Sequence, residues 1–181
     1  MSDGHQAPGL LLFFPDLVKA CRKHTRLPFE VHLAATEPAD WVAPFAEAGA
    51  DLIMFYLQHG NDPVKVIRAI KAAGKQVGIS LLLDEPLEVL EPYWPDVDLV
   101  TILGTPIGKG FSMDPSVPDK IRRAKAIIRE RGLKAEVQAD GGIRRSSVPL
   151  MAAAGVDYIV PGSLMFGEDP AEMRKWLAEL G

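Results

Sequence analysis

Short runs of apolar residues alternate along the chain with longer stretches in which apolar and polar positions follow a helical period. Apolar runs of roughly four to eight residues predict buried strands, and the longer amphipathic stretches predict helices. The predicted strands are Phe29–Leu33, Asp51–Leu57, Gln76–Leu83, Asp98–Leu103, Lys134–Ala139 and Asp157–Val160. The predicted helices are Asp16–His24, Trp41–Ala48, Pro63–Ala73, Leu87–Tyr93, Pro115–Arg131, Ser147–Ala154 and Pro170–Leu180.

The alternation of apolar strands with helices predicts a parallel sheet covered by helices. The uniform repeating units favour a TIM-type (β/α)8 barrel, and no Gly-x-Gly-x-x-Gly turn follows an early strand to favour an open, dinucleotide-binding sheet. A closed barrel has about eight strands, whereas the pattern yields six. We therefore expect a single barrel domain over residues 1–181, incomplete at its start and lacking the first one to two strands of the fold.

Two of the predicted helix-to-strand joints have nearly the same sequence. Residues 48–53 read Ala-Gly-Ala-Asp-Leu-Ile, and residues 154–159 read Ala-Gly-Val-Asp-Tyr-Ile. In each, a glycine stands where the helix should end and an aspartate opens the strand. Acidic residues also precede prolines where helices should begin, as in Asp62-Pro63 and Asp169-Pro170, which is typical of a helix N-terminus.

Composition and charge narrow the class of protein. The chain has 181 residues, of which 48% are hydrophobic and 24% charged, as in a globular domain. The net charge is −4 and no dense basic run occurs, so we expect no nucleic-acid partner. No apolar run approaches the roughly 18 residues of a membrane span, and the single cysteine, Cys21, favours a reducing cytoplasm. A homo-oligomer is possible, because three large aromatic side chains could lie at a subunit interface as readily as in the core. They are Phe13, Phe14 and Trp94.

Chemistry in a β/α barrel lies at the carboxyl ends of the strands. There His32 is either a hydrogen-bonded core histidine or a metal ligand or proton carrier. Asp140 ends the next-to-last predicted strand. The loops after the last two strands commonly bind phosphate in this fold, and glycines let backbone N–H groups approach an anion. The glycine turns Gly141-Gly142 and Gly162-Ser163 therefore predict a phosphorylated small molecule as ligand, although Gly162-Ser163 could also be a tight turn capped by its serine.

The loop over residues 105–113 is longer than the others, is rich in glycine and carries one lysine. We interpret Gly108, Lys109 and Gly110 as part of a mobile lid over the ligand. An ordinary glycine-rich surface loop is the alternative interpretation.

Over nearly its whole length the chain resembles the ribulose-phosphate 3-epimerases. The resemblance depends on the order and spacing of short segments, chiefly Asp3-Gly4-His5, Val31-His32-Leu33, Asp140-Gly141-Gly142-Ile143 and Gly162-Ser163-Leu164-Met165-Phe166. In that family the carbon next to a ketone is inverted, which converts D-ribulose 5-phosphate to D-xylulose 5-phosphate. One aspartate removes a proton, a second returns one to the opposite face, and a divalent metal stabilises the enediolate.

The resemblance implies roles for six residues of this chain. Asp140 matches an aspartate that is both acid/base and metal ligand, and His32 matches a histidine ligand of the metal. The residues that match the phosphate cradle are Gly141, Gly142, Gly162 and Ser163. Two oxygen and two nitrogen ligands, as the family uses, suit zinc, manganese, iron or cobalt about equally.

The chain also departs from the family pattern. The family's other histidine and aspartate lie on a strand that would precede Met1, and Asp3 matches the aspartate of the Asp-Gly-His turn. Ala34 replaces a methionine, Tyr56 replaces a histidine, and Lys109 places a positive charge in the lid. We expect the first strands to lie upstream in a longer protein, because an open barrel would expose strand edges and apolar core. A short protein that has lost one catalytic half is the alternative.

Three functions therefore remain open on the sequence. The first is an epimerase that acts on ribulose 5-phosphate with a divalent metal. The second is a related barrel, an epimerase or lyase for another phosphorylated ketose, which Lys109 motivates. The third is a catalytically inactive phosphate-binding barrel protein.

Overall fold

The computed structural model describes residues 1–3, 11–12, 14–57, 62–107, 112–167 and 169–180. The chain forms two compact units. Unit 1 comprises Met1–Ser80 and Pro95–Leu99, and unit 2 comprises Leu81–Trp94 and Val100–Gly181. Strands and helices alternate in both units.

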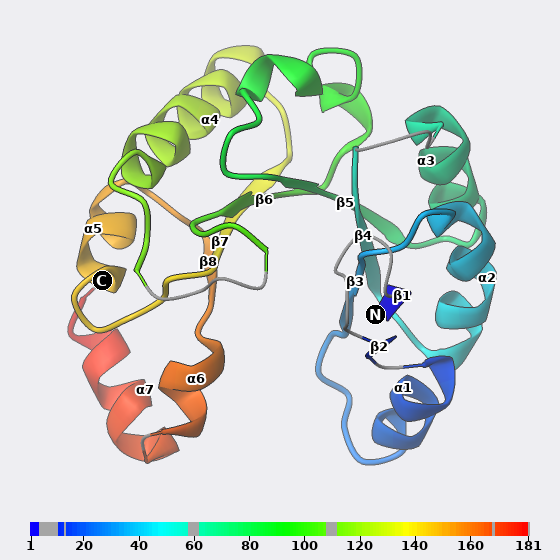
Figure 1. The fold of residues 1–181 in the computed structure, drawn as a ribbon, viewed down its shortest axis with the longest axis horizontal. Helices are drawn as coiled ribbons and strands as arrows, with labels where there is room; N and C mark the ends of the chain where they lie inside the picture. Colours follow the sequence, from blue (N-terminus) through cyan, green and yellow to red (C-terminus); the bar gives the residue numbers. More distant parts are fainter. Residues whose placement is uncertain (4–10, 13, 58–61, 108–111, 168, 181) are drawn as a thin grey trace. The chain divides into compact units, whose positions relative to one another are not determined.

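Unit 1 is built on three parallel strands, β3 (Glu30–Leu33), β4 (Leu52–Tyr56) and β5 (Gln76–Leu81). Helices α2 (Pro38–Ala48) and α3 (Pro63–Ala72) lie along one side of these strands (Figure 1). Their apolar side chains bury the strands on that side, which is why the strands read as continuous apolar runs. The elements that precede β3 are β1 (Ser2–Asp3), β2 (Leu11–Leu12) and α1 (Pro15–Arg22). The largest fully buried side chains of this unit include Leu33, Phe45, Ile53, Phe55 and Ile70.

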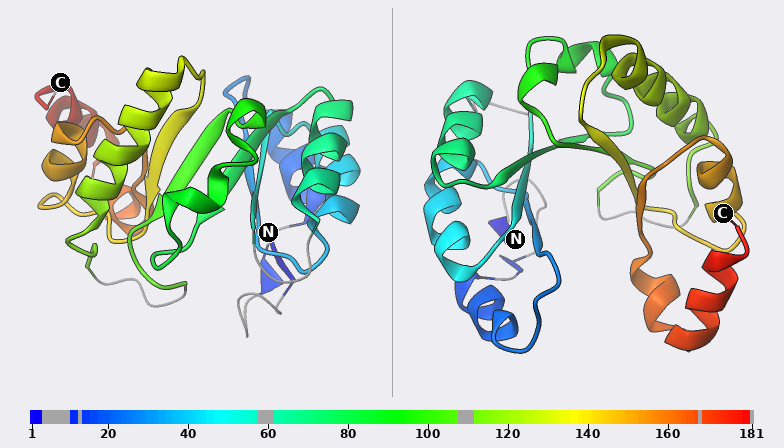
Figure 2. Two further views of the ribbon diagram at one scale, coloured as in Figure 1. Left: turned by 90° about the horizontal axis from the view of Figure 1, so that it is seen from above. Right: turned by 180° about the vertical axis from the view of Figure 1, so that it is seen from behind.

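Unit 2 contains β6 (Leu99–Leu103) from its second residue on, together with β7 (Glu136–Asp140) and β8 (Tyr158–Val160), and these strands neighbour one another in that order. Helices α4 (Val117–Arg131) and α5 (Val148–Ala153) lie along one side of them (Figure 2). The short α6 (Gly162–Phe166) and then α7 (Pro170–Ala178) follow β8. In the described part of the chain, no helix is long and apolar enough to cross a membrane.

All six predicted strands are present, and each begins and ends within two residues of its predicted bounds. The helix predicted over Leu87–Tyr93 is wrong. A 3-10 helix, η1 (Leu87–Leu90), and a second one, η2 (Trp94–Asp96), take its place. Pro92 explains the difference, because proline has no N–H to donate and its ring clashes with the carbonyl four residues back.

Two other interpretations also change with the structure. Trp94 belongs to the core, since it is only 2% exposed, whereas Phe14 is 56% exposed. Phe13 lies outside the described residues. Gly162 and Ser163 do not form an isolated turn but begin α6, because Pro161 stands at its N-cap and the carbonyl of Pro161 accepts the N–H of Met165.

Aspartates at the start of alternate strands tie neighbouring strands together. Each carboxylate accepts the backbone N–H of a residue at the start of the preceding strand, at 2.7–2.8 Å. In return, the N–H of each aspartate donates to the carbonyl of that same residue, at 2.9 Å. The three pairs are Asp51 with Phe29, Asp98 with Val77 and Asp157 with Val137. The near repeat in the sequence thus encodes a repeated strand-to-strand contact.

Candidate functional site

Asp140 is the last residue of β7 and lies half-buried at its carboxyl end. Its backbone carbonyl accepts the N–H of Gly104 at 2.6 Å, which fixes it against the end of β6. Burial raises the pKa of the Asp140 carboxyl above its usual value, although a hydrogen bond from the Gly141 backbone opposes this. A carboxyl group held on a rigid strand with a raised pKa is suited to accept and return a proton.

The backbone conformation and the crowded surroundings at positions 141 and 142 both require glycine. Both have positive φ, +87° and +70°, which other residues rarely adopt. A Cβ on Gly141 would lie 2.6 Å from Thr105 Oγ1, and a Cβ on Gly142 would lie 2.4 Å from the backbone nitrogen of Met113. The close approach of the loop that follows β6 therefore demands glycine at both positions. Their role in a phosphate cradle stays a prediction.

Arg144 connects the loop after β7 with the first turn of α6, which follows β8. Its Nη1 donates to Ser163 Oγ at 3.3 Å and to the carbonyl of Ile143 at 2.7 Å. A Cβ on Gly162 would meet nothing within 4 Å, so the space beside it is open. The structure thus brings the predicted Gly-Gly turn, Ser163 and a guanidinium to one place in unit 2. The sequence analysis did not predict Arg144 as part of this site. The signal was available, because a positively charged residue directly follows Asp-Gly-Gly-Ile in the sequence.

Ser147 fixes the turn that carries Arg144. Its hydroxyl oxygen accepts the N–H of Arg144 at 2.9 Å, and the hydroxyl donates to the carbonyl of Gly142 at 2.9 Å. Ser147 is only 6% exposed. This buried serine therefore has both donor and acceptor satisfied, and it holds the backbone between the glycine turn and α5 in one conformation.

His32 lies one residue before the end of β3 in unit 1. Its ring stacks on Tyr56, with ring centroids 4.8 Å apart and planes at 28°. The residue as a whole is half-buried, and its Nε2 is buried and has no hydrogen-bond partner among the described residues. Burial, and secondarily the nearby charge of the chain's amino group, lowers the pKa of His32 to about 4. The imidazole is therefore neutral at neutral pH, as a metal ligand must be.

The two predicted metal ligands belong to different units, His32 to unit 1 and Asp140 to unit 2. Within either unit, no three His, Cys, Asp or Glu side chains of the described residues form a metal-binding group. The donors themselves fit a divalent first-row metal, since one is a neutral imidazole with an unpartnered nitrogen and the other a carboxylate. Metal ligation by His32 and Asp140 stays a prediction.

Two other predicted segments lie wholly or partly outside the described residues. The lid residues Gly108, Lys109 and Gly110 are not among them, and neither are Gly4 and His5 of the Asp-Gly-His segment. The remaining member, Asp3, holds the loop that follows β3: its carboxylate accepts the N–H and hydroxyl of Thr36 at 2.7 and 2.9 Å.

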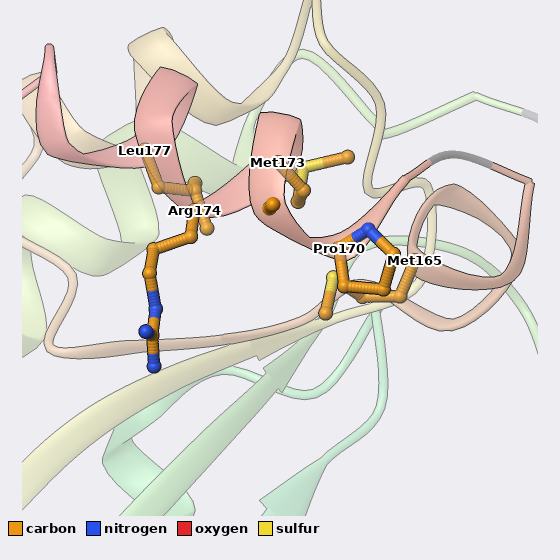
Figure 3. Close-up of a pocket in the computed structure, with 6 residues that line it drawn as sticks. Met165, Pro170, Met173, Arg174 and Leu177 are labelled. Carbon is orange, nitrogen blue, oxygen red and sulfur yellow. The ribbon is translucent and has the colours of Figure 1, made fainter.

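A hollow of about 580 Å³ lies between α6 and α7 (Figure 3). Its lining includes Met165 from α6 and Pro170, Met173 and Leu177 from α7, and among the described lining residues only Arg174 is charged. None of the predicted site residues lines it. The described residues of its lining include no acid or base for proton transfer, so the predicted proton carrier, Asp140, lies elsewhere, at the end of β7.

Comparison with known proteins shows which sequences are similar to this chain. A sequence model described as the ribulose-phosphate 3-epimerase family matches residues 1–166. The ribulose-phosphate 3-epimerase of Treponema pallidum is 35% identical over 167 residues, which cover 91% of this chain and 75% of that protein. That of Bacillus subtilis is 32% identical over 180 residues, which cover 98% of this chain and 82% of that protein. The cytoplasmic isoform of rice, Oryza sativa subsp. japonica, is 32% identical over 176 residues, which cover 94% of this chain and 75% of that protein.

Solved structures of low sequence identity share the fold. One point mutant of the tryptophan synthase α-subunit from Pyrococcus furiosus gives a TM-score of 0.66 at 18% identity, and the match covers 95% of this chain and 72% of that one. A second mutant of the same subunit gives a TM-score of 0.63 at 18% identity, and there the match covers 81% of this chain and 60% of that one. With the alternating strands and helices, this likeness confirms the TIM-type β/α barrel as the fold class.

Proposed function

The chain belongs to the ribulose-phosphate 3-epimerase family, and we propose that it interconverts D-ribulose 5-phosphate and D-xylulose 5-phosphate. The observation that carries the proposal is Asp140, which stands at the carboxyl end of β7 with a raised pKa. The loop that follows it meets Ser163 through Arg144. An acid/base next to a place that suits a phosphate is the arrangement that this reaction needs.

In this proposal Asp140 exchanges the proton on one face of the carbon next to the ketone, and inversion needs a second proton carrier on the opposite face, a role assigned to none of the described residues. Its raised pKa makes it a stronger base than an exposed aspartate, because burial disfavours the charged carboxylate. His32 and Asp140 are assigned as ligands of a divalent metal. When bound, such a metal would stabilise negative charge on the ketone oxygen. The stacking of His32 on Tyr56 holds the imidazole plane in one orientation.

The phosphate of the substrate is assigned to the loops after β7 and β8. Gly162 offers backbone without a side chain beside open space, and Ser163 offers a hydroxyl. The Arg144 guanidinium next to Ser163 supplies positive charge and several N–H donors for phosphate oxygens. Binding by these groups would place the sugar toward Asp140, which ends the neighbouring strand.

Exchange of the substrate's α-proton with solvent tests the proposal. Ribulose 5-phosphate is incubated with the chain and zinc, manganese, iron or cobalt in D2O, and deuterium at carbon 3 is followed by NMR. We expect exchange by the natural sequence and a loss of at least about a hundredfold in Asp140→Asn. Asp119→Asn, which changes an exposed aspartate of α4, is the matched control and should retain the rate. Absence of exchange by the natural sequence with every metal contradicts the proposal.

A related barrel that acts on another phosphorylated ketose, as an epimerase or a lyase, is the second candidate. Lys109 motivates it, because a lysine near a ligand can assist chemistry that carboxylates alone do not. A panel of phosphorylated ketoses separates this candidate from the first. If Lys109→Ala leaves all rates unchanged, the reason for the second candidate is removed.

A catalytically inactive phosphate-binding barrel is the third candidate. It predicts that phosphorylated sugars raise the melting temperature without any dependence on metal. Stoichiometric divalent metal in the purified chain argues against it.

We also place the protein in the cytoplasm, since Cys21, its one cysteine, is a free and exposed thiol that suits a reducing compartment.

A further inference from the structure

Three neighbouring strands of unit 1 end in polar or aromatic side chains on one face of the sheet. His32 pairs in register with Met54, and Tyr56 pairs in register with Ser80. Because side chains alternate between faces along a strand, His32, Met54, Tyr56 and Ser80 share one face. Each of His32, Tyr56 and Ser80 is the last or next-to-last residue of its strand. This face therefore presents polar groups at the carboxyl ends of the strands, where ligands bind in β/α folds.

Below this polar row the face is apolar. A Cβ built on Gly78 would lie only 2.8 Å from Met54 Cβ and 3.1 Å from Met54 Cε, so the Met54 side chain covers Gly78. Gly78 comes two residues before Ser80 on β5 and points to the same face. Ser80 thus has a packed apolar floor on the side away from the strand ends.

Two polar atoms of this row, Ser80 Oγ and His32 Nε2, are buried and have no hydrogen-bond partner among the described residues. Ser80 is 0% exposed, and its hydroxyl has no hydrogen-bond partner among the residues that the structure describes. His32 Nε2, two strands away, is in the same state. An unpaired buried hydroxyl destabilises a fold, and alanine at that position would avoid the penalty. Such groups are rare in native proteins, and a ligand, an ion or an ordered water can complete their hydrogen bonds.

We propose that Ser80 is a ligand-binding residue of the same site as His32, and that its hydroxyl bonds to a hydroxyl group of the sugar. A sugar hydroxyl can both donate and accept a hydrogen bond, so it can pair with the Ser80 hydroxyl whether that hydroxyl donates or accepts. This inference rests on the proposed function for the identity of the ligand, a phosphorylated ketose. It assigns a sugar contact to β5 of unit 1, and it makes Ser80 a determinant of sugar specificity.

The variant Ser80→Ala separates binding from structure through two readouts. The first is the melting temperature without ligand, which should rise, because the substitution removes an unpaired buried hydroxyl and leaves almost no cavity. The second is the dissociation constant for ribulose 5-phosphate, which should increase about tenfold, as expected for the loss of one hydrogen bond. The dissociation constant for inorganic phosphate should stay unchanged, because Ser80 does not take part in phosphate binding.

Ser147→Ala is the matched control for stability. It also removes a buried serine hydroxyl, but this one is hydrogen-bonded at 2.9 Å to two backbone groups, so the melting temperature should fall. A fall in the melting temperature of Ser80→Ala would show that its hydroxyl has a partner within the protein, and would overturn the inference. An unchanged dissociation constant for ribulose 5-phosphate would overturn it too. If the natural sequence binds no phosphorylated ketose, the proposed function itself fails, and this inference fails with it.

Discussion

Arg144 and Arg145 are adjacent in sequence but make different contacts. Arg144 donates to Ser163 Oγ, whereas the Arg145 guanidinium lies over the Trp176 ring, 4.5 Å from its centroid. If Arg144 binds the phosphate of the substrate, Arg144→Ala removes a charge-assisted hydrogen bond worth about 1.5–3 kcal/mol. We therefore expect the dissociation constant for ribulose 5-phosphate to rise about ten- to a hundredfold, as measured by isothermal titration calorimetry.

Arg145→Ala serves as the control for this substitution. It removes the same charge from the same turn, so a general electrostatic effect would weaken binding in both variants alike. Ribulose without its phosphate gives a second comparison, because its affinity should be the same in Arg144→Ala and in the natural sequence. Equal losses in the two arginine variants would refute a specific role for Arg144.

The aspartates that open alternate strands act at the scale of the element. The Asp157 carboxylate accepts the Val137 N–H at 2.7 Å and pairs with Lys125 at 2.7 Å, and both side chains of the ion pair are about a third exposed or less. Asp157→Ala should lower the free energy of unfolding by about 2 kcal/mol, because the N–H of β7 loses a charged partner. Urea denaturation measures the difference. Lys125→Met keeps the hydrogen bond from the Val137 N–H to Asp157 and should lower the free energy of unfolding by under about 1 kcal/mol. A larger loss in Lys125→Met than in Asp157→Ala would show that the ion pair, and not this hydrogen bond, stabilises the strand contact.

The end of α4 provides a pH-dependent test. Arg131 donates to both carboxylate oxygens of Glu91, at 2.7 and 2.9 Å, and these hydrogen bonds lower the pKa of Glu91 below its ordinary value of 4.5. A depressed carboxyl pKa stabilises the folded state above the unfolded pKa, and this contribution disappears as the pH falls through the folded pKa. We expect Glu91→Gln to melt slightly below the natural sequence at pH 7, with the difference shrinking as the pH falls below 4.5, the ordinary pKa of the carboxyl, and also shrinking in high salt. A difference that persists in acid would point to packing rather than charge.

At the scale of the whole molecule, metal binding should couple to stability. A metal that binds only the folded chain raises the free energy of unfolding by about 2.7 kcal/mol at a hundred times its dissociation constant. Zinc, manganese or cobalt should therefore raise the melting temperature, and a chelator should reverse the change. His32→Ala should abolish most of the shift, whereas His24→Ala, an exposed histidine outside the strands, should retain it. Equal shifts in both variants would exclude His32 as a ligand.

Local signals in the sequence predicted most of the elements. The apolar runs located every strand of the barrel that the structure shows, and Asp62 and Asp169 cap α3 and α7 by accepting two N–H groups each. The prediction failed where a local signal was overlooked, as with Pro92 inside a supposed helix. It also failed where the pattern was too short to carry a period, as with the five residues of α6.

The sequence by itself determined the alternation of strands and helices and the family, because periodicity and short motifs depend only on neighbours along the chain, and it predicted a role for Asp140. Only the tertiary structure decided what surrounds each side chain. It showed that the loop after β6 demands Gly141 and Gly142, that Arg144 meets Ser163, and that the Ser80 hydroxyl is buried without a partner in the described part of the chain. Such contacts join residues distant in sequence, and burial and hydrogen bonding exist only once the chain has folded.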